Sequence, residues 1–362
     1  MDYGLDHESV NLMMHIPHSE GITHLVWLQT AFLGDLVLTT GAFDLAKKSM
    51  PKIKQFLITN AVGVAALKNH PSLDKVFLLD KKRLKSFGEV KKAIFAEGGL
   101  GAGSVLLVPH KSLRSALFAN FLGLAYITYR QASLSFLATK KIERIAVFHE
   151  AVRIALMLEP LGISREAILN VKPSLAKLAP TDDKALIKTR NKLQIGVAPG
   201  SVWGTKKWPW QKFLEVVCHF CVLGHEVVLL GSKAESSEAA QIMACVPKEF
   251  SKQVTDKVGK TDLLGLFAAI SELDLLIAND SAPIHIAAAY DVPTVAVFGA
   301  TSPELGFGPL ATKSKVVSID LPCRPCSAHG PQKCPLTHFR CMRDLGSEKV
   351  IEASLLLLAD AN

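Results

Sequence analysis

Short apolar runs alternate with helical patterns along this chain, and this alternation limits the folds it can adopt. The runs cover residues 24–28, 53–59, 76–79 and 105–108 in the first half, and 195–198, 226–230, 275–278 and 294–298 in the second. Strands that alternate with helices predict a parallel sheet, because each helix crosses over a face of the sheet. The pattern occurs twice, so we expect two doubly wound α/β domains, which 362 residues can accommodate.

The most informative turn follows the run 275–278 and reads Asn279-Asp-Ser-Ala-Pro-Ile-His285. Asp280 and Ser281 are favourable helix N-caps, and Pro283 suits a first helical turn. A strand that ends at an open helix N-terminus predicts an anion site, because free N–H groups and the helix dipole favour negative charge. In open α/β sheets, ligands bind at these strand ends. A well-capped core helix without a ligand explains this segment equally well.

A second turn of similar chemistry follows the run 195–198. It contains two glycines that permit close backbone approach, the hydroxyl of Ser201, and the paired cations Lys206 and Lys207. The spacing does not match the phosphate loop of NTPases, so that class is not indicated. Lysines before a helix are often simply solvated, but two such turns in one half of a chain favour a phosphate site.

A third turn follows the run 24–28 and contains Gly34 and Asp35, with a helix expected from about residue 36. The commonest role of an aspartate at a helix start is capping. The alternative is a general base held between two domains.

Five motifs stand in a specific order along residues 22–345. They are Leu33-Gly34-Asp35 with Leu38-Thr39-Thr40, Gly200-Ser201 with Lys206-Lys207-Trp208-Pro209, Leu229-Leu230-Gly231-Ser232, Asn279-Asp280-Ser281-Ala282-Pro283-Ile284-His285, and Pro322-Cys323-Arg324-Pro325-Cys326. Together they resemble the ADP-heptose:lipopolysaccharide heptosyltransferase family, most closely its heptosyltransferase II branch. Gly41 departs from the family pattern, in which a proline is usual.

The resemblance implies a GT-B glycosyltransferase with two Rossmann-like domains that face each other across a cleft. Residues 20–175 would bind the acceptor and residues 190–345 the nucleotide sugar, with the linker within 172–192. A helix within 346–362 is expected to pack back on the N-terminal domain. The implied reaction is inverting transfer of a heptose from ADP-heptose to the lipopolysaccharide inner core, with no cofactor.

The same resemblance assigns roles to individual residues. The catalytic residues would be the base Asp35 and the lysine Lys206, which also binds the donor. The remaining donor-binding positions would be Ser201, the acidic Glu235, the diphosphate turn Asp280, Ser281 and Ala282, and the nearby His285.

The net charge of +8 is concentrated in the first half, where six Lys or Arg side chains lie between residues 81 and 92. Such a basic half suits an anionic acceptor or anionic lipid headgroups. It would also suit nucleic acid, but we find no recognised binding motif, and few aromatic residues lie among the lysines. The resemblance implies that this anionic acceptor is the lipopolysaccharide core, and we expect Lys111 and Arg114 to bind it. We also expect peripheral contact with the inner face of the inner membrane.

Targeting and cysteine patterns complete the expectations. Residues 1–20 carry four acidic groups and no basic, apolar leader, and the uncharged stretch 115–129 is too short to span a bilayer, so a cytoplasmic location is expected. Cys323, Cys326, Cys334 and Cys341 have a spacing that could hold zinc, but our expectation is no metal. An Asp-x-Asp metal motif is missing, so the lysine and the helix start are expected to stabilise the leaving group.

Two other functions stay open. One is a different nucleotide-sugar enzyme on the same fold, such as an epimerase or another hexosyltransferase. The other is a non-catalytic relative that binds a sugar nucleotide or an anionic surface.

Overall fold

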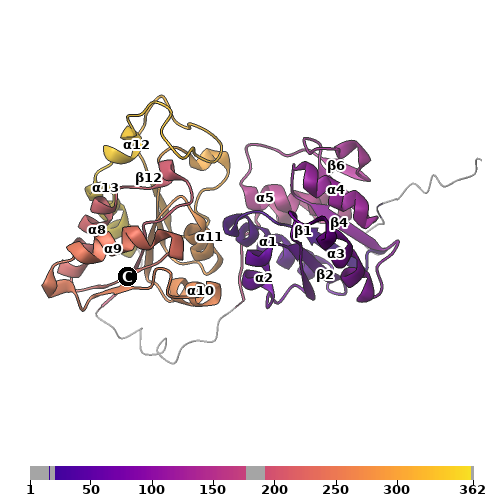
Figure 1. Cartoon of the computed structure of the whole chain (residues 1–362), viewed down its shortest axis with the longest axis horizontal. Helices are drawn as coiled ribbons and strands as arrows, with labels where there is room; N and C mark the ends of the chain where they lie inside the picture. The colour runs from indigo at the N-terminus through magenta and orange to yellow at the C-terminus, as the bar shows by residue number, and fades with distance from the viewer. Residues whose placement is uncertain (1–15, 17–20, 177–191, 360–362) are drawn as a thin grey trace, which may run out of the picture.

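The computed structural model describes residue 16 and residues 21–176 and 192–359, which form two lobes side by side (Figure 1). The N-terminal lobe contains a six-stranded sheet in the order β3-β2-β1-β4-β5-β6. Every strand pair in it is parallel. Its strands are β1 (His24–Leu28), β2 (Lys54–Thr59), β3 (Lys75–Leu78), β4 (Ser104–Val108), β5 (Ala125–Tyr129) and β6 (Lys140–Ile142).

The C-terminal lobe repeats this topology in the order β12-β11-β10-β7-β8-β9, again with parallel pairs. Its strands are β7 (Gln194–Ala198), β8 (Glu226–Leu229), β9 (Val254–Asp256), β10 (Leu275–Asn279), β11 (Thr294–Val297) and β12 (Ser314–Val317). Both orders are those of a Rossmann sheet, whose order reverses between β1 and β4 and between β7 and β10. The predicted pair of doubly wound α/β domains is confirmed.

Helices cover the faces of both sheets (Figure 1). In the N-terminal lobe they are α1 (Leu33–Ser49), α2 (Ala61–Leu67), α3 (Leu84–Ala96), α4 (Leu113–Leu122), α5 (Glu150–Ala155) and α6 (Arg165–Leu169). In the C-terminal lobe they are α8 (Trp210–Val222), α9 (Ser236–Cys245), α10 (Leu263–Ser271), α11 (Ala282–Ala289), α12 (Arg340–Arg343) and α13 (Ser347–Ala359).

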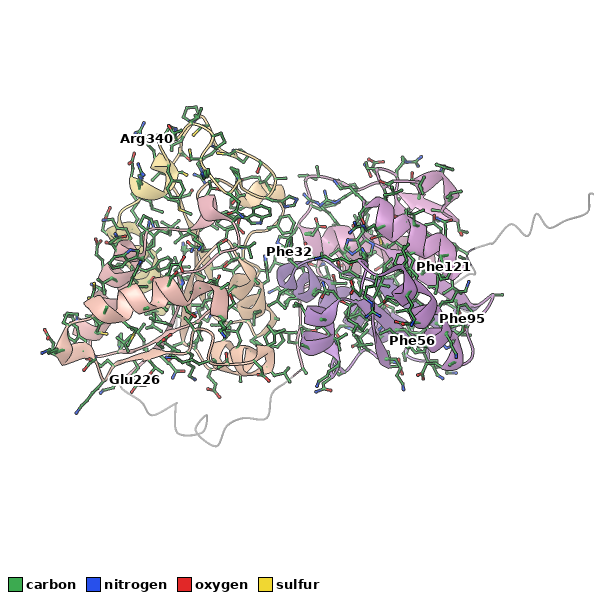
Figure 2. All side chains as sticks on the ribbon, in the orientation of Figure 1. Phe32, Phe56, Phe95, Phe121, Glu226 and Arg340 are labelled. Carbon is green, nitrogen blue, oxygen red and sulfur yellow. The ribbon has the colours of Figure 1, made fainter. Side chains whose placement is uncertain are left out.

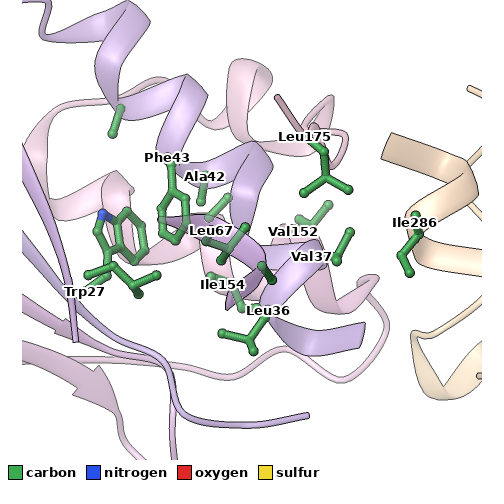
Figure 3. Packing of buried hydrophobic residues seen from close by; sticks show 14 of the residues in the cluster. Trp27, Leu36, Val37, Ala42, Phe43, Leu67, Val152, Ile154, Leu175 and Ile286 are labelled. Atoms are coloured by element: carbon green, nitrogen blue, oxygen red, sulfur yellow. The ribbon is translucent and has the colours of Figure 1, made fainter. Parts of the chain in front are cut away.

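The two lobes share one apolar cluster that passes through their junction. Helix α1 packs against α11, and α2 against α10. Val37 and Val152 of the N-terminal lobe belong to the same buried cluster as Ile284 and Ile286 of α11 (Figure 3). Burial of such side chains stabilises each by roughly 1.5–3 kcal/mol, so the junction holds the starts of α1 and α11 next to each other.

The C-terminal helix does not pack where it was expected. Helix α13 lies on α8 and on strands β10–β12 of its own lobe. Its Val350 and Leu357 are buried with Phe213 and Phe220 of α8. The expectation that it packs on the N-terminal domain is therefore wrong, because this apolar face is already covered by the C-terminal core.

Two further expectations can be compared with the described residues. The predicted linker 172–192 lies largely outside the described residues. Across the described ranges, none of the helices combines the length and apolar character needed to cross a membrane.

Candidate active site

The two switch points of the sheets place the predicted turns at the junction of the lobes. Residues 29–32 follow β1 and lead into α1, whose first turn contains Gly34, and residues 110–112 follow the neighbouring strand β4. In the other lobe Ser201 follows β7, while Asp280 and Ser281 follow the neighbouring strand β10. Parallel strands end at the same edge, so each pair of turns converges on one crevice.

The first turn of α1 faces the first turn of α11. A Cβ atom added to Gly34 would lie 2.9 Å from Cδ2 of His285 and 3.8 Å from the Cα atom of Ala282. This close approach explains the glycine. The N-cap of α1 is Phe32, so Asp35 lies inside the first turn of the helix and is not its N-cap residue. Backbone hydrogen bonds at Phe32 and at Asp35 itself favour the ionised Asp35 carboxylate, so a helix-start role stays open beside the role of a base.

Asp35 occupies an environment that disfavours its charge. Burial and then the nearby Glu150 carboxylate raise the pKa of Asp35 to about 6, while backbone hydrogen bonds and Arg144 act in the opposite direction. Glu150 itself is held by Arg153, whose Nη1 lies 2.9 Å from Oε2 of Glu150. A carboxylate with such a pKa can take and return a proton near neutral pH.

Lys206 and Asp280 form a buried ion pair in the other lobe. Nζ of Lys206 lies 2.6 Å from Oδ2 of Asp280, and the two side chains are 12% and 4% exposed. The Thr301 hydroxyl donates a 2.6 Å hydrogen bond to the same oxygen. The Asp280 carboxylate thus holds the ammonium of Lys206 in place, and the donor-binding assignment of Asp280 stays a prediction.

Side chains at the start of α11 do not cap the first backbone N–H groups of this helix. Ser281 is the N-cap, but among the described residues its side chain makes no capping hydrogen bond and instead donates to the carbonyl of Asn279 at 3.3 Å. Neither Asp280 nor Ser281 therefore caps the helix in the predicted way. Asn279 also accepts from the Trp208 N–H at 3.1 Å and donates to the Pro199 carbonyl at 2.8 Å, which joins the β7 and β10 turns.

His285 links the Asp35 side of the site to the Lys206 side. It is 4% exposed, and within the described chain its Nδ1 has no hydrogen-bond partner. Burial, then His149 and Lys206, lower the pKa of His285 to about 3, so the ring is neutral. Its contact with Gly34 and its coupling to Lys206 bring the Asp35 turn and the Lys206 site to the same histidine from opposite lobes.

The remaining donor-side predictions occupy the rim of the β7 turn. Ser201 is 5% exposed, and its hydroxyl accepts from the Trp203 N–H at 3.3 Å. Oε2 of Glu235 accepts from the backbone N–H of Ser232 at 2.6 Å. The Glu235 carboxyl group lies directly against Gly200, where a Cβ would come within 2.1 Å of it.

The acceptor-side predictions lie at the start of α4. Lys111 and Arg114 are exposed there, and sequence reasoning gave no special role to their neighbour Lys81. Nζ of Lys81 donates to the Ser115 hydroxyl at 2.6 Å. Burial and then Arg114 lower the pKa of Lys81 to about 8. His110, also missed, accepts the Thr30 N–H at 2.9 Å through Nε2, which links this cationic corner to the Asp35 turn.

The four spaced cysteines do not assemble into a ligand set. Across the described ranges, no group of three or more His, Cys, Asp or Glu side chains is arranged to hold a metal ion. Sγ of Cys326 donates to the carbonyl of Cys323 at 3.3 Å, while burial raises the pKa of Cys341 to about 11.

Comparison with known proteins assigns the family. The model of "Glycosyltransferase family 9 (heptosyltransferase)" matches residues 100–335. The chain belongs to glycosyltransferase family 9. This family member is 34% identical over 178 residues to lipooligosaccharide heptosyltransferase 2 of Campylobacter jejuni, a match that covers 49% of this chain and 54% of the relative. The match thus spans about half the length of that curated relative.

Solved structures share the fold of this family 9 chain over nearly its whole length. A family 9 glycosyl transferase from Veillonella parvula has a TM-score of 0.78 at 21% identity and covers 93% of this chain and 98% of its own. The ADP-heptose lps heptosyltransferase II of E. coli has a TM-score of 0.73 at 20% identity and covers 94% and 99%. These likenesses confirm the GT-B type of the two-lobed fold.

Proposed function

We propose that this chain is an inverting, heptosyltransferase II-like enzyme that moves a heptose from ADP-heptose to the lipopolysaccharide inner core. The observation that carries the proposal is the meeting of the two helix starts at His285. Asp35 comes to this point from one lobe, and Lys206 with the open end of α11 comes from the other. Family membership and the name of the Campylobacter jejuni relative support the choice of heptose.

Asp35 acts as the general base in this proposal. The acceptor hydroxyl attacks the anomeric carbon of the donor and gives its proton to the Asp35 carboxylate. The new bond joins the acceptor oxygen to the anomeric carbon while the bond from that carbon to the diphosphate oxygen breaks, which inverts the configuration. General-base catalysis of this kind is worth roughly 10²- to 10⁴-fold in rate.

Lys206 and the first N–H groups of α11 stabilise the leaving group. ADP departs with the bonding electron pair, so negative charge grows on the diphosphate as the bond breaks. The ammonium of Lys206 and the free backbone donors at Ser281 and Ala282 are fixed before the reaction begins. A preorganised donor is worth roughly 3–4 kcal/mol by analogy with oxyanion holes. Ser201, Glu235 and His285 complete the donor-binding set.

The cationic corner at the start of α4 supports an anionic acceptor. The start of α4 carries Lys111 and Arg114, and Lys81 binds it through the Ser115 hydroxyl. His110, next to Lys111, accepts a hydrogen bond from Thr30, which lies in the turn before Asp35. We assign Lys111 and Arg114 to the acidic groups of the core sugars. The acceptor is a lipid, so we also propose that the chain works as a cytoplasmic protein at the inner face of the inner membrane.

The test is to mix the purified chain with ADP-heptose, with and without a heptosylated Kdo–lipid A core acceptor. ADP release and acceptor mass are measured together. We expect acceptor-dependent ADP and a mass gain of one heptose. ADP-heptose conversion without any acceptor would instead support an epimerase, and donor binding without turnover a non-catalytic relative.

Two variants assign the catalytic roles, with Lys212→Met at a partly exposed ion pair as the matched control. Asp35→Asn should lower turnover about 10²- to 10⁴-fold while donor binding stays normal. Lys206→Met should weaken both donor affinity and rate. Near-normal turnover of Asp35→Asn would remove it from the base role, and an unchanged rate constant for Lys206→Met would remove it from leaving-group stabilisation.

A further inference from the structure

Helix α4 is apolar on its solvent face as well as on its buried face. Ala116, Phe118 and other residues of one face are buried under the sheet. On the opposite face, Leu113, Leu117 and Phe121 follow one another at intervals of four residues and are 51%, 50% and 46% exposed. An ordinary surface helix is polar on its outer face, so this stripe indicates a surface that something apolar covers.

The apolar stripe continues onto the solvent face of α3. The ring centroid of Phe87 lies 6.2 Å from that of Phe121 in the stripe and 4.9 Å from that of the buried Phe118, which joins the two helices. Nζ of Lys91 lies 5.0 Å from the ring centroid of Phe121 and 6.0 Å from that of Phe95. Figure 2 places Phe95 and Phe121 on the side of the N-terminal lobe that points away from the C-terminal lobe.

A loop beyond β5 extends the surface at the other end of α4. The backbone N–H of Ser133 donates to the carbonyl of Lys111 at 3.0 Å, which ties the loop to the start of the helix. Further along this loop lie Phe136 and Leu137, whose side chains are 72% and 48% exposed. Exposed leucine and phenylalanine side chains thus lie along α4 and beside both of its ends.

The segment that carries α3 and α4 is rich in cations. Residues 80–122 include eight Lys or Arg but only Asp80, Glu89 and Glu97 as acids. Glu97 pairs with Lys75 at 3.3 Å and Glu89 lies 4.0 Å from Arg83. The exposed Lys85 and Lys92 stand seven residues apart on α3 and therefore share one side of that helix.

We propose that the solvent faces of α3 and α4, with the Phe136 loop, dock on an anionic phospholipid bilayer. The leucine and phenylalanine side chains would enter the headgroup–acyl boundary, and the lysines would contact lipid phosphates. Charge complementarity selects lipid over a second copy of this basic face, which would repel it. The docking helix begins at Leu113, beside the Lys81 corner, so it would bring the acceptor site close to the membrane that holds the acceptor.

This inference deepens the membrane contact in the proposed function, but it can fail separately, because vesicle binding requires neither donor nor turnover. The test is co-sedimentation of the full chain with vesicles of phosphatidylglycerol and phosphatidylethanolamine, and with phosphatidylcholine alone. We expect binding to the anionic vesicles that weakens with salt, and little binding to phosphatidylcholine. No binding of the wild type to anionic vesicles would overturn the proposal.

Variants locate the surface. Leu117→Glu places a negative charge, of the same sign as the lipid headgroups, at the centre of the stripe. This variant should bind anionic vesicles about tenfold more weakly or worse. The matched control Val222→Glu, on an α8 residue that is 70% exposed, should bind as the wild type does. Equal loss in both variants would contradict the proposed face. If size-exclusion chromatography shows a dimer for the wild type and a monomer for Leu117→Glu, the stripe binds a second copy of the chain instead of lipid.

A second variant keeps the test valid if Leu117→Glu folds poorly. Lys85→Glu with Lys92→Glu changes only exposed charges, and it should weaken binding to anionic vesicles by about tenfold or more. Heptosyl transfer to a short, lipid-free acceptor should keep its wild-type rate in this variant. Unchanged vesicle binding would show that these lysines do not face lipid.

Discussion

At the scale of single residues, the site carries charge that the folded protein tolerates poorly. The carboxyl group of Asp35 is partly buried beside Glu150, which disfavours its ionised form. Its pKa is higher in the folded state than in the unfolded state, so folding is weakened once Asp35 ionises. This cost is absent below the unfolded pKa of 3.8, grows as pH rises, and is complete above about 6.

Asp35→Asn should therefore be more stable than the wild type at pH 8, by about 1–3 kcal/mol, and equal to it near pH 4. Urea denaturation at both pH values measures this difference. In the wild type, kcat/KM should fall as pH decreases through about 6, because the base becomes protonated. A pH-independent stability difference, or activity that persists at pH 5, would contradict this account.

The buried pair of Lys206 and Asp280 gives a second prediction. Asp280→Asn leaves a buried ammonium without its counter-ion, which should cost about 3–5 kcal/mol in the free energy of unfolding. The diphosphate of ADP would replace the missing charge, so ADP should raise the melting temperature of this variant more than that of the wild type. Thermal denaturation with and without ADP measures both effects.

Asp344→Asn is the control for that experiment, because it breaks an ion pair with Arg340 whose two side chains are 60% and 44% exposed. An exposed pair contributes about 0–1 kcal/mol, so this variant should melt close to the wild type. If ADP shifts Asp280→Asn no more than the wild type, the lysine is not in the diphosphate site.

At the scale of elements, close packing of α1 against a neighbouring backbone explains one departure from the family pattern. A Cβ atom added to Gly41 would lie 2.1 Å from the carbonyl oxygen of Lys172 and 2.8 Å from Cγ2 of Val171. The helix therefore lies directly on the segment that follows α6. Since Ser174 donates its backbone N–H to the Thr40 hydroxyl at 2.8 Å, this segment is fixed to α1.

Gly41→Ala should destabilise the chain by about 1–3 kcal/mol, or more, because the new methyl group meets a backbone atom that cannot move aside. The matched control is Gly88→Ala in α3, where a Cβ meets nothing within 4 Å. Alanine is the better helix former, so this control should be neutral or more stable. Equal melting temperatures for the two variants would contradict the packing argument.

Sequence reasoning predicted elements well where the pattern was local. The interior strands, such as β1 and β10, are continuous apolar runs and were placed within one or two residues. Strand β5 was missed because it continues the uncharged stretch that begins in α4. Three of the four edge strands, β6, β9 and β12, were missed, and each has only three or four residues and is partly exposed. The fourth edge strand, β3, is equally short but was predicted from the apolar run 76–79.

The same limit applies to the site. The segments with Asp35, Lys206 and Ser281 each follow a strand, so the sequence could place them at the strand ends, while their chemical roles stay predictions. The partners Glu150 and Thr301 could not be predicted, since only the tertiary fold brings them to Asp35 and Asp280. The sequence also could not predict on which lobe α13 packs, because the pattern of an amphipathic helix does not specify the surface that covers its apolar face.

At the scale of the whole molecule, one apolar cluster couples the two lobes. Ile286→Ala, a change of a fully buried side chain, should cost about 2–5 kcal/mol. We expect a single calorimetric transition that moves to lower temperature, since the cluster includes both α1 and α11. Leu355→Ala, at a residue that is 40% exposed on α13, should change little. Two peaks, of which one moves, would show that the lobes unfold independently.

The division of labour between the sheets also has a consequence for engineering. Both turns of the β7/β10 crevice belong to one lobe, while the cations at α4 belong to the other. A chimera that takes residues 192–359 from this chain and the first lobe from a relative should retain the donor preference of this chain and acquire the acceptor preference of the relative. The graft would succeed only where the exchanged α1 and α2 match the apolar surfaces of α10 and α11. Evolution could change the acceptor by the same exchange without redesigning the leaving-group site.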